Sequence, residues 1–200
     1  MIKKIVIIDY NTGNVSAIAN MLKKIGQKPI ISNKYEVIDT SDVIILPGVG
    51  SFDRAIKKLE EYNLIGILKK KIQDNTKILG ICLGMQLLCL GSDEGNKEGL
   101  NVFNVFCKSF NSTQSNNIFM GWSNIKIVKE NYKFNFLDKS KFYFLHKYYF
   151  PFHKDYSIAI SENDIEFSCF VKKNNVFGVQ FHPEKSHNFG INFFKNFINL

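Results

Sequence analysis

The sequence predicts an α/β fold, in which a mostly parallel (mixed) sheet is flanked by helices and antiparallel strands are added in the second half. In the first half, short continuous apolar runs alternate with segments of helical periodicity, which is typical of parallel strands buried on both faces. After Gly91 the expected strands become shorter and more alternating, and Asn-rich turns, Phe and Tyr become frequent. This second pattern favours antiparallel pairing.

The first half contains three expected strands, each followed by a turn or a helix. The first apolar run ends at the turn formers Asp9 to Gly13, and the second is stopped by Pro47-Gly-Val-Gly50. Apolar residues at helical spacing fill most of the intervening segments. We expect strands at 4–8, 43–46 and 77–81, and helices at 14–25, 53–62, 64–74 and 85–90.

The second half is expected to add strands and one final helix. Phe189, Phe193 and Phe197 share one face of that helix, which we place at 188–199. No internal repeat or low-complexity linker is evident, so we expect a single domain spanning residues 1–200. The expected strands of this half are 125–128, 142–145, 157–160, 167–171 and 176–180.

The composition argues against nucleic-acid binding and membrane insertion. The net charge is +8, but Arg54 is the only arginine and the lysines are spread along the chain, unlike a cluster built to bind phosphates. The apolar run after Lys4 ends at Asp9. It is shorter than a signal-peptide core of about 7–15 residues and a spanning helix of about 20. We therefore expect a cytoplasmic protein.

Four cysteines, Cys82, Cys89, Cys107 and Cys169, form no CxxC pair. In a reducing compartment a disulfide framework is not expected. Three of them are expected to be small buried hydrophobic residues, and Cys82 is the exception.

Cys82 lies in a pattern that suits a nucleophile. Gly80-Ile-Cys82-Leu-Gly84 follows an expected buried strand and opens a helix. A nucleophile on such a tight turn has strained backbone angles, and small residues two positions away allow neighbouring segments to pass closely. The Leu83 N–H would then face a tetrahedral oxyanion. The alternative is a buried cysteine in a glycine-bearing turn, and this motif alone does not separate the two.

A base and its orienting group are expected near the C-terminus. A thiol nucleophile needs a base within hydrogen-bond reach, and the base needs a partner that fixes its tautomer. His182 and Glu184 follow an expected strand end, and positions two apart project to the same side of an extended chain. No HxH or HxxxH spacing occurs. We therefore expect an acid/base pair rather than a metal site.

Together these motifs resemble the class I (triad) glutamine amidotransferases and, more narrowly, the glutaminase subunit of imidazole glycerol phosphate synthase. The similarity runs in order along the whole chain and implies a flavodoxin-like fold. The motifs are Leu46-Pro-Gly-Val-Gly-Ser-Phe52, Gly80-Ile-Cys-Leu-Gly-Met-Gln-Leu-Leu88 and Gly178-Val-Gln-Phe-His-Pro-Glu-Lys-Ser186, with similar segments at Ile8–Asn14, Met120–Trp122 and Tyr143–Tyr149.

The resemblance implies a role for each matching residue. Cys82 would form a glutamyl thioester, His182 would be the acid/base and Glu184 its orienting group. The loop of Gly48, Val49 and Gly50 would supply the Val49 N–H as a second oxyanion donor beside that of Leu83. This loop is thought to need reorientation before the enzyme becomes fast. Gln86 and the backbone around Lys147 and Tyr148 would hold glutamine, and no metal or other cofactor is implied.

The implied partner is a (β/α)8-barrel cyclase subunit, which would use the ammonia to convert a phosphorylated ribulosyl intermediate into imidazole glycerol phosphate and an aminoimidazole carboxamide ribotide, in histidine biosynthesis. We expect its docking face at Asn11, Thr12, Asn14, Trp122 and Lys185. For Trp122, core packing is an equal alternative.

The sequence departs from the family near this face and not in the triad. Where the family usually has Pro-His-Met-Gly-Trp-Asn, this chain has Ile118-Phe-Met-Gly-Trp-Ser123. The usual His-Ser-Tyr is replaced by His146-Lys-Tyr148, and the common Asp-Tyr-Gly-Met-Gly is replaced by Asp9-Tyr-Asn-Thr-Gly13. The departures favour one alternative, a paralogue that supplies ammonia to another synthase, such as one aminating a surface-polysaccharide sugar. Two further alternatives are a non-catalytic binding subunit, against which the intact Cys82, His182 and Glu184 argue, and a self-contained hydrolase, against which the Pro47-Gly-Val-Gly50 loop argues.

Overall fold

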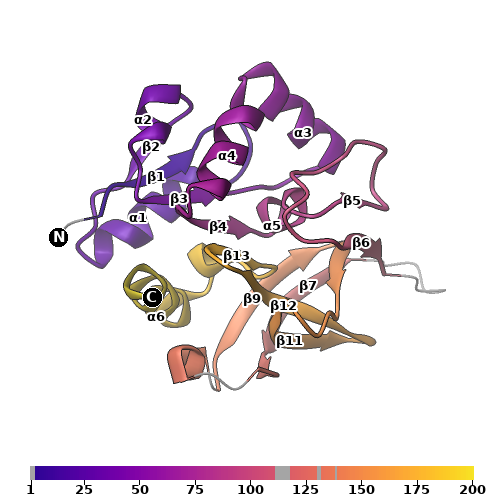
Figure 1. The fold of residues 1–200 in the computed structure, drawn as a ribbon. Coiled ribbons are helices and arrows are strands. Elements are labelled where there is room, and N and C mark those ends of the chain that lie inside the picture. Colours follow the sequence, from indigo (N-terminus) through magenta and orange to yellow (C-terminus); the bar gives the residue numbers. More distant parts are fainter. Residues whose placement is uncertain (1–2, 111–117, 130–131, 138) are drawn as a thin grey trace.

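The structure is a computed structural model that describes residues 3–110, 118–129, 132–137 and 139–200. Its main sheet carries helices on both faces (Figure 1). The strands are β1 Ile5–Ile8, β2 Ile30–Ser32, β3 Val43–Leu46, β4 Lys77–Ile81, β5 Gly91–Ser92, β6 Phe106–Ser109, β7 Phe119–Asn124, β8 Lys126–Ile127, β9 Lys141–His146, β10 Tyr148–Pro151, β11 Ser157–Asn163, β12 Ile165–Lys173 and β13 Val176–Val179. The helices are α1 Val15–Lys24, α2 Tyr35–Asp39, α3 Phe52–Glu61, α4 Leu64–Gln73, α5 Leu83–Leu87 and α6 His187–Asn199, with 3-10 turns η1 Tyr132–Leu137 and η2 Pro183–Lys185.

The parallel part of the sheet joins the two halves of the chain. Strands β2, β1, β3, β4 and β13 lie side by side and are all parallel, so β13 from the C-terminal region pairs directly with β4. The strands run in register, with Gly178 of β13 opposite Gly80 of β4. The carboxyl ends of β4 and β13 therefore lie side by side. Ligands of such sheets bind at this edge, and the residues that follow these two strands meet there.

The second half extends the sheet with antiparallel strands. β12 pairs antiparallel with β13, β10 and β11, and β10 continues to β6. Strands β7 and β9 form a separate two-stranded antiparallel sheet. The predicted mixed sheet with added antiparallel strands is thus confirmed.

Two hydrophobic cores fill the two sides of the parallel strands. Side chains alternate along β1, so Ile5 and Ile7 enter one core while Val6 and Ile8 enter the other. The first core includes α1, α6 and a large cluster of phenylalanines, and the second includes α2, α3, α4 and α5. Both faces of the central parallel strands are therefore covered by apolar side chains, as the continuous apolar runs predicted.

The predicted elements of the first half agree with the structure to within one residue at each end, with one exception. The helix after Cys82 was expected at 85–90, but α5 begins at Leu83 and ends at Leu87. The elements without strong periodicity were missed. These are β2, α2, β5, β6, β7 and β10.

The turn between β4 and α5 depends on glycine because backbones approach each other there. A Cβ on Gly84 would lie 1.9 Å from the Leu46 carbonyl oxygen, and one on Gly80 would lie 2.6 Å from the Gly84 carbonyl oxygen. A Cβ on Gly48 would lie 2.7 Å from the Gly84 nitrogen. These distances are shorter than any real side-chain contact, so the loop after β3 packs directly against the turn that carries Cys82.

We predict that Gly84→Ala destabilises the fold by at least about 3 kcal/mol, because the Leu46 carbonyl cannot move without displacing β3. Gly66→Ala is the matched control. A Cβ at Gly66 within α4 meets no atom in the described residues, so this change should stabilise by about 0.5–1 kcal/mol. Urea unfolding of both variants measures the difference. Equal stability of Gly84→Ala and the unchanged chain would contradict the packing argument.

A candidate cysteine-histidine active site

Cys82 has the strained backbone that the glycine pattern predicted. Its φ is 53° and its ψ is −110°, a region that non-glycine residues rarely adopt. Its N–H donates to the Val179 carbonyl at 2.7 Å, which ties the turn to the end of β13. Leu83 is the first residue of α5, so its N–H has no acceptor within the helix and can face a ligand beside the sulfur.

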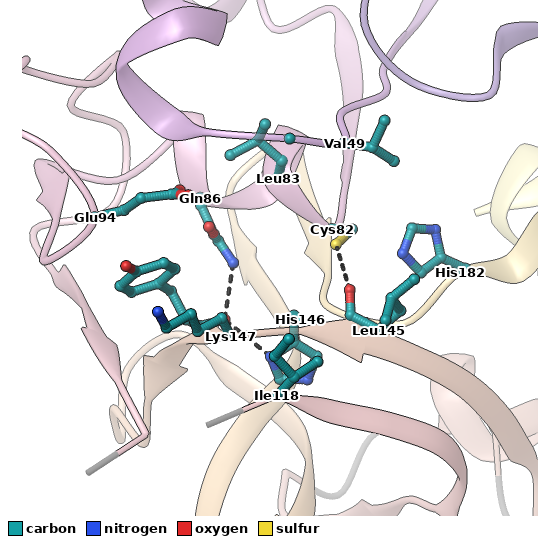
Figure 2. Close-up of a pocket in the computed structure, with 12 residues that line it drawn as sticks. Val49, Cys82, Leu83, Gln86, Glu94, Ile118, Leu145, His146, Lys147 and His182 are labelled. Carbon is teal, nitrogen blue, oxygen red and sulfur yellow. Dashed lines mark hydrogen bonds between the residues drawn. The ribbon is translucent and has the colours of Figure 1, made fainter. Parts of the chain in front are cut away.

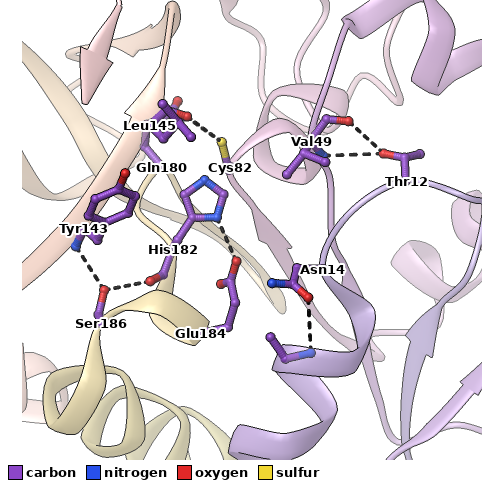
Figure 3. A network of polar contacts seen from close by, with 11 residues as sticks. Thr12, Asn14, Val49, Cys82, Tyr143, Leu145, Gln180, His182, Glu184 and Ser186 are labelled. Atoms are coloured by element: carbon purple, nitrogen blue, oxygen red, sulfur yellow. Dashed lines mark hydrogen bonds and ion pairs between the residues drawn. The ribbon is translucent and has the colours of Figure 1, made fainter. Parts of the chain in front are cut away.

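His182 lies between Cys82 and Glu184 (Figure 3). Its Nδ1 is 2.8 Å from Glu184 Oε1, and the Cys82 sulfur lies beside the other side of its ring (Figure 3). The side chains of His182 and Glu184 are each only 2 % exposed. The structure therefore brings the three predicted residues together from two neighbouring strand ends.

Burial by itself lowers the pKa of His182, because a charged imidazole loses its hydration. A negative charge on the nearby Cys82 sulfur and the Glu184 carboxylate act in the opposite direction and raise the pKa of His182 to about 10. The geometry thus favours an imidazolium beside sulfur at neutral pH, the arrangement in which the thiolate is the attacking species.

The backbone of His182 is held by a second set of contacts. Its N–H donates to the Tyr143 carbonyl at 2.9 Å, and Ser186 Oγ donates to its carbonyl at 2.6 Å. The Tyr143 N–H in turn donates to Ser186 Oγ at 3.0 Å (Figure 3). This network connects the catalytic segment to β9.

A pocket of about 220 Å³ opens onto the Cys82 sulfur (Figure 2). A water molecule occupies about 30 Å³ of liquid, so the cavity has the size of a small molecule such as an amino acid. Its lining includes most of the predicted glutamine-binding residues. The lining residues are Val49, Gly50, Cys82, Leu83, Gln86, Glu94, Ile118, Leu145, His146, Lys147, Tyr148 and His182.

The Tyr148 carbonyl accepts two hydrogen bonds that shape the pocket floor. Gln86 Nε2 donates to it at 2.9 Å, and His146 Nδ1 lies 2.9 Å from it. Burial, opposed by this hydrogen bond, lowers the pKa of His146 to about 3, so the ring is neutral and donates from Nδ1. His146 and Gln86 thereby hold the chain at Lys147 and Tyr148.

Gln180 and Glu94 are among the residues of the site that the sequence analysis missed. Gln180 Nε2 donates to Cys82 Sγ at 3.6 Å and its Oε1 accepts from Gln86 at 3.3 Å. Its position two residues before His182 on an extended chain was a usable signal. Glu94 lines the pocket and its Oε2 accepts from the Phe52 N–H at 2.9 Å. No periodicity marks Glu94, since it lies in a loop brought to the pocket only by tertiary structure.

The Val49 N–H does not lie where the oxyanion expectation requires it. It donates to Thr12 Oγ1 at 3.4 Å, and the Thr12 hydroxyl donates to the Val49 carbonyl at 3.0 Å (Figure 3). Both polar groups of this peptide segment are thus held by one side chain, away from the sulfur. The expected second oxyanion donor is therefore engaged elsewhere in this conformation.

The same loop is held by Tyr10, whose hydroxyl donates to the Pro47 carbonyl. Tyr10 is fully buried, and burial is the main cause of the strongly raised pKa of its phenol. The phenol therefore remains a neutral donor. The loop after β1 thus fixes the loop after β3 by two side chains, Tyr10 and Thr12.

Two of the residues expected at a docking face, Trp122 and Lys185, pack against rings on the surface. Trp122 is 46 % exposed and stacks on His187 with ring centroids 5.5 Å apart, so the core-packing alternative is wrong. Lys185 Nζ lies 5.8 Å from the centroid of the Tyr143 ring.

The expected docking residues of the first loop also make contacts within the chain. Asn14 Oδ1 accepts from Ala17 N–H at 3.3 Å and caps α1, and Asn11 Nδ2 donates to the Tyr62 hydroxyl at 2.5 Å. Several exposed apolar side chains line the pocket or lie on the strand beside it. Val49, Ile118 and Leu145 line the pocket, and Met120 and Trp122 lie on β7, which pairs with β9.

Within the described parts of the chain, no cluster of three or more His, Cys, Asp or Glu side chains has an arrangement that could hold a metal ion. In the same residues, every helix is too short or too polar to cross a bilayer. The cysteines Cys82, Cys89, Cys107 and Cys169 are all free and buried.

Comparison with known proteins decides the family. The family model for glutamine amidotransferase class-I matches residues 6–200. The chain belongs to the class I glutamine amidotransferase family.

This amidotransferase is also similar to named relatives over nearly its whole length. It is 46 % identical to the imidazole glycerol phosphate synthase subunit HisH 2 of Methanococcus maripaludis, covering 97 % of this chain and 98 % of that one. It is 38 % identical to the subunit of the same name from Pseudomonas aeruginosa, covering 98 % and 99 %. A crystal structure of a glutamine amidotransferase has the same fold, with a TM-score of 0.75 at 16 % identity over 97 % of both chains.

The pKa of His182 leads to a prediction for this amidotransferase. The His182 ring should stay protonated until the pH approaches about 10, and Glu184→Gln should move its titration to lower pH because one negative neighbour is lost. Ring resonances followed by NMR measure this. Glu166→Gln, on the exposed part of β12, is the control and should leave the titration unchanged.

The raised pKa of His182 also determines how its contribution to the stability of the fold depends on pH. The pKa of His182 is raised above its ordinary value of about 6.5, so its contribution to stability is complete below that pH and is lost as the pH rises towards about 10. In Glu184→Gln the loss still begins near pH 6.5 but should be complete at lower pH, because only the folded-state pKa falls. A His182 that titrates near pH 6.5 in the unchanged chain would contradict both statements.

Proposed function

We propose that the chain is the glutaminase subunit of imidazole glycerol phosphate synthase, hydrolysing glutamine to glutamate and ammonia. The observation that carries the proposal is the position of His182 between Cys82 and Glu184 at the edge of an amino-acid-sized pocket. The nearly full-length similarity to subunits with that name supports it.

Cys82 is the nucleophile. Its sulfur attacks the side-chain amide carbon of glutamine, and the Leu83 N–H stabilises the oxyanion that forms. His182 then donates its Nε2 proton to the amide nitrogen, so the carbon–nitrogen bond breaks and ammonia leaves. The product on the enzyme is a glutamyl thioester, and Glu184 keeps the ring oriented through Nδ1.

Water completes the cycle. His182, now neutral, accepts a proton from a water molecule as the oxygen attacks the thioester, and the sulfur leaves as thiolate. Glutamate is released and the original imidazolium returns. The two steps consume one water and produce one ammonia for each glutamine.

Glu94 and Gln86 position the substrate. With the amide carbon of glutamine at Cys82, the charged end of the amino acid reaches the opposite side of the pocket, where Glu94 lies (Figure 2). Its Oε2 accepts from Phe52, which leaves Oε1 for the α-ammonium group. Gln86 lies between the two ends and lines the pocket wall.

Ammonia passes to a (β/α)8-barrel cyclase subunit that docks over the pocket, in the cytoplasm. Exposed apolar residues around the pocket support a docked surface there, since such residues rarely gather on a monomer without a partner. Asn11, Thr12, Asn14, Trp122 and Lys185 belong to this face.

Thr12 links docking to catalysis. While its hydroxyl holds both polar groups of Val49, the second oxyanion donor is absent. Losing one such donor costs about 3–4 kcal/mol, enough to keep the chain slow until a docked partner moves the first loop. The present conformation is therefore the resting state.

A second candidate is a paralogue that supplies ammonia to another synthase, such as one aminating a sugar. Both relatives carry the number 2 in their name, HisH 2, which marks them as one of more than one subunit of this kind. This numbering favours the paralogue as a second candidate. The departures at Ile118 and Lys147, beside the pocket, favour it as well.

One experiment tests the function and separates the two candidates. The chain, expressed with its cyclase, should rescue a histidine auxotroph that lacks its own glutaminase subunit. Cys82→Ala should rescue only with added ammonium salts, because the nucleophile is lost while the cyclase chemistry is separate. Cys169→Ala is the control and should retain rescue, at a stability cost of about 1–3 kcal/mol for the repacked core.

Two results would speak against the proposal. Glutamine-dependent rescue by Cys82→Ala would exclude Cys82 as the nucleophile. Glutamine hydrolysis without any rescue would favour the paralogue.

Thr12→Val should raise the glutaminase rate of the chain without its partner about tenfold. The substitution keeps the shape and removes the hydroxyl, so the two hydrogen bonds to Val49 are lost and its N–H becomes free to turn. Glutamate release measures the rate, and the partner-stimulated rate should stay the same. Thr12→Ser, which retains a hydroxyl, is the control. An unchanged basal rate in Thr12→Val would mean that the contact does not restrain the loop.

A further inference from the structure

The pocket contains a pair of opposite charges at the end remote from Cys82. Figure 2 shows Cys82 and His182 on one side of the pocket, with Glu94 and Lys147 on the other and Gln86 between them. The proposed function uses Glu94 and leaves the Lys147 side chain without a role.

The Lys147 ammonium lies against the pocket wall and lacks an acidic partner. Its Nζ is 5.9 Å from the centroid of the Tyr148 ring, a cation–π contact that keeps the side chain beside the pocket. None of the salt bridges found among the described residues involves Lys147. The positive charge of Lys147 nevertheless interacts with Glu94, since it opposes the rise in the pKa of Glu94 that burial causes.

The shape of glutamine places two charges at this end. The amide carbon lies three bonds from Cα, and Cα carries both the α-ammonium and the α-carboxylate. When the amide carbon contacts Cys82, both charges therefore reach the region of Glu94 and Lys147. Glu94 attracts the ammonium and repels the carboxylate, so the carboxylate needs a cation of its own.

Few lining residues can supply that cation. The pKa of His146 is lowered to about 3, so this ring is neutral. His182 lies at the sulfur end and is paired with Glu184. Among the residues that line the pocket, Lys147 is the remaining side chain with a positive charge.

We propose that the Lys147 ammonium binds the α-carboxylate of glutamine and thereby determines specificity for the free amino acid. This inference rests on the proposed function. The chain around Lys147 is fixed for the role, because His146 and Gln86 hold the next carbonyl and the Lys147 carbonyl accepts from the Phe110 N–H at 3.3 Å. The serine usual at this position of the family could offer a hydroxyl but no charge.

The test compares substrate analogues that lack one charge each. 4-Aminobutanamide lacks the α-carboxylate, and glutaramate lacks the α-ammonium. In Lys147→Met the KM for glutamine should rise about tenfold with kcat little changed, because a charge-assisted contact made in both ground and transition states is lost. The inhibition constant of glutaramate should rise by a similar factor, and that of 4-aminobutanamide should not change.

Matched variants separate this role from a structural one. Lys147→Arg should restore the KM, and Lys69→Met, the same charge change on the exposed face of α4, should leave all constants unaltered. Glu94→Gln should show the opposite selectivity, weakening 4-aminobutanamide and sparing glutaramate. All rates are measured as glutamate release by the full chain with its cyclase.

The outcomes distinguish the inference from the proposed function. An unchanged KM in Lys147→Met, or equal weakening of both analogues, would overturn the role of Lys147 and leave glutamine hydrolysis intact. A chain that releases no glutamate from glutamine would overturn the proposed function and this inference with it.

Discussion

The site depends on the close approach of two backbone turns at the edge of the sheet. Gly84 packs against the Leu46 carbonyl and Gly48 packs against the Gly84 nitrogen, so the start of the loop after β3 and the turn after β4 are in direct backbone contact. This contact holds Cys82 in a conformation that costs about 1–3 kcal/mol, and the surrounding sheet compensates for that cost. Any side chain at these glycines would separate Cys82 from the loop of Gly48, Val49 and Gly50.

The parallel pairing of β4 with β13 brings the remaining chemistry to the same place. Cys82 follows one strand and His182 follows the other, and their sequence separation is irrelevant once the strands are neighbours. The antiparallel strands have a different task. β9 of the small sheet and β10 of the main sheet deliver His146, Lys147 and Tyr148 to the opposite wall of the pocket. One half of the chain thus supplies the nucleophile and the other supplies most of the substrate-binding wall.

The loops at this edge couple activity to the surface. Thr12 and Tyr10 hold the loop after β3, and Glu94 accepts from Phe52, which begins the helix that follows this same loop. A change at the surface of the first loop can therefore alter the oxyanion site without moving Cys82 or His182. Under the proposed mechanism, the protonated His182 already lies beside the sulfur, and the Val49 N–H that Thr12 holds would be the group left to be switched.

The sequence by itself determined the class of sheet, the turn around Cys82 and the pair of His182 and Glu184, because each depends on local patterns: apolar runs, glycines two positions from the cysteine, and alternation along a strand. Short strands such as β2 and β6 were not predictable, since their pairing partners rather than their own residues stabilise them. Only the tertiary structure decided that Glu94 and Gln180 belong to the pocket and that Thr12 occupies the Val49 N–H. These contacts join residues far apart in the chain, and no short-range pattern encodes them.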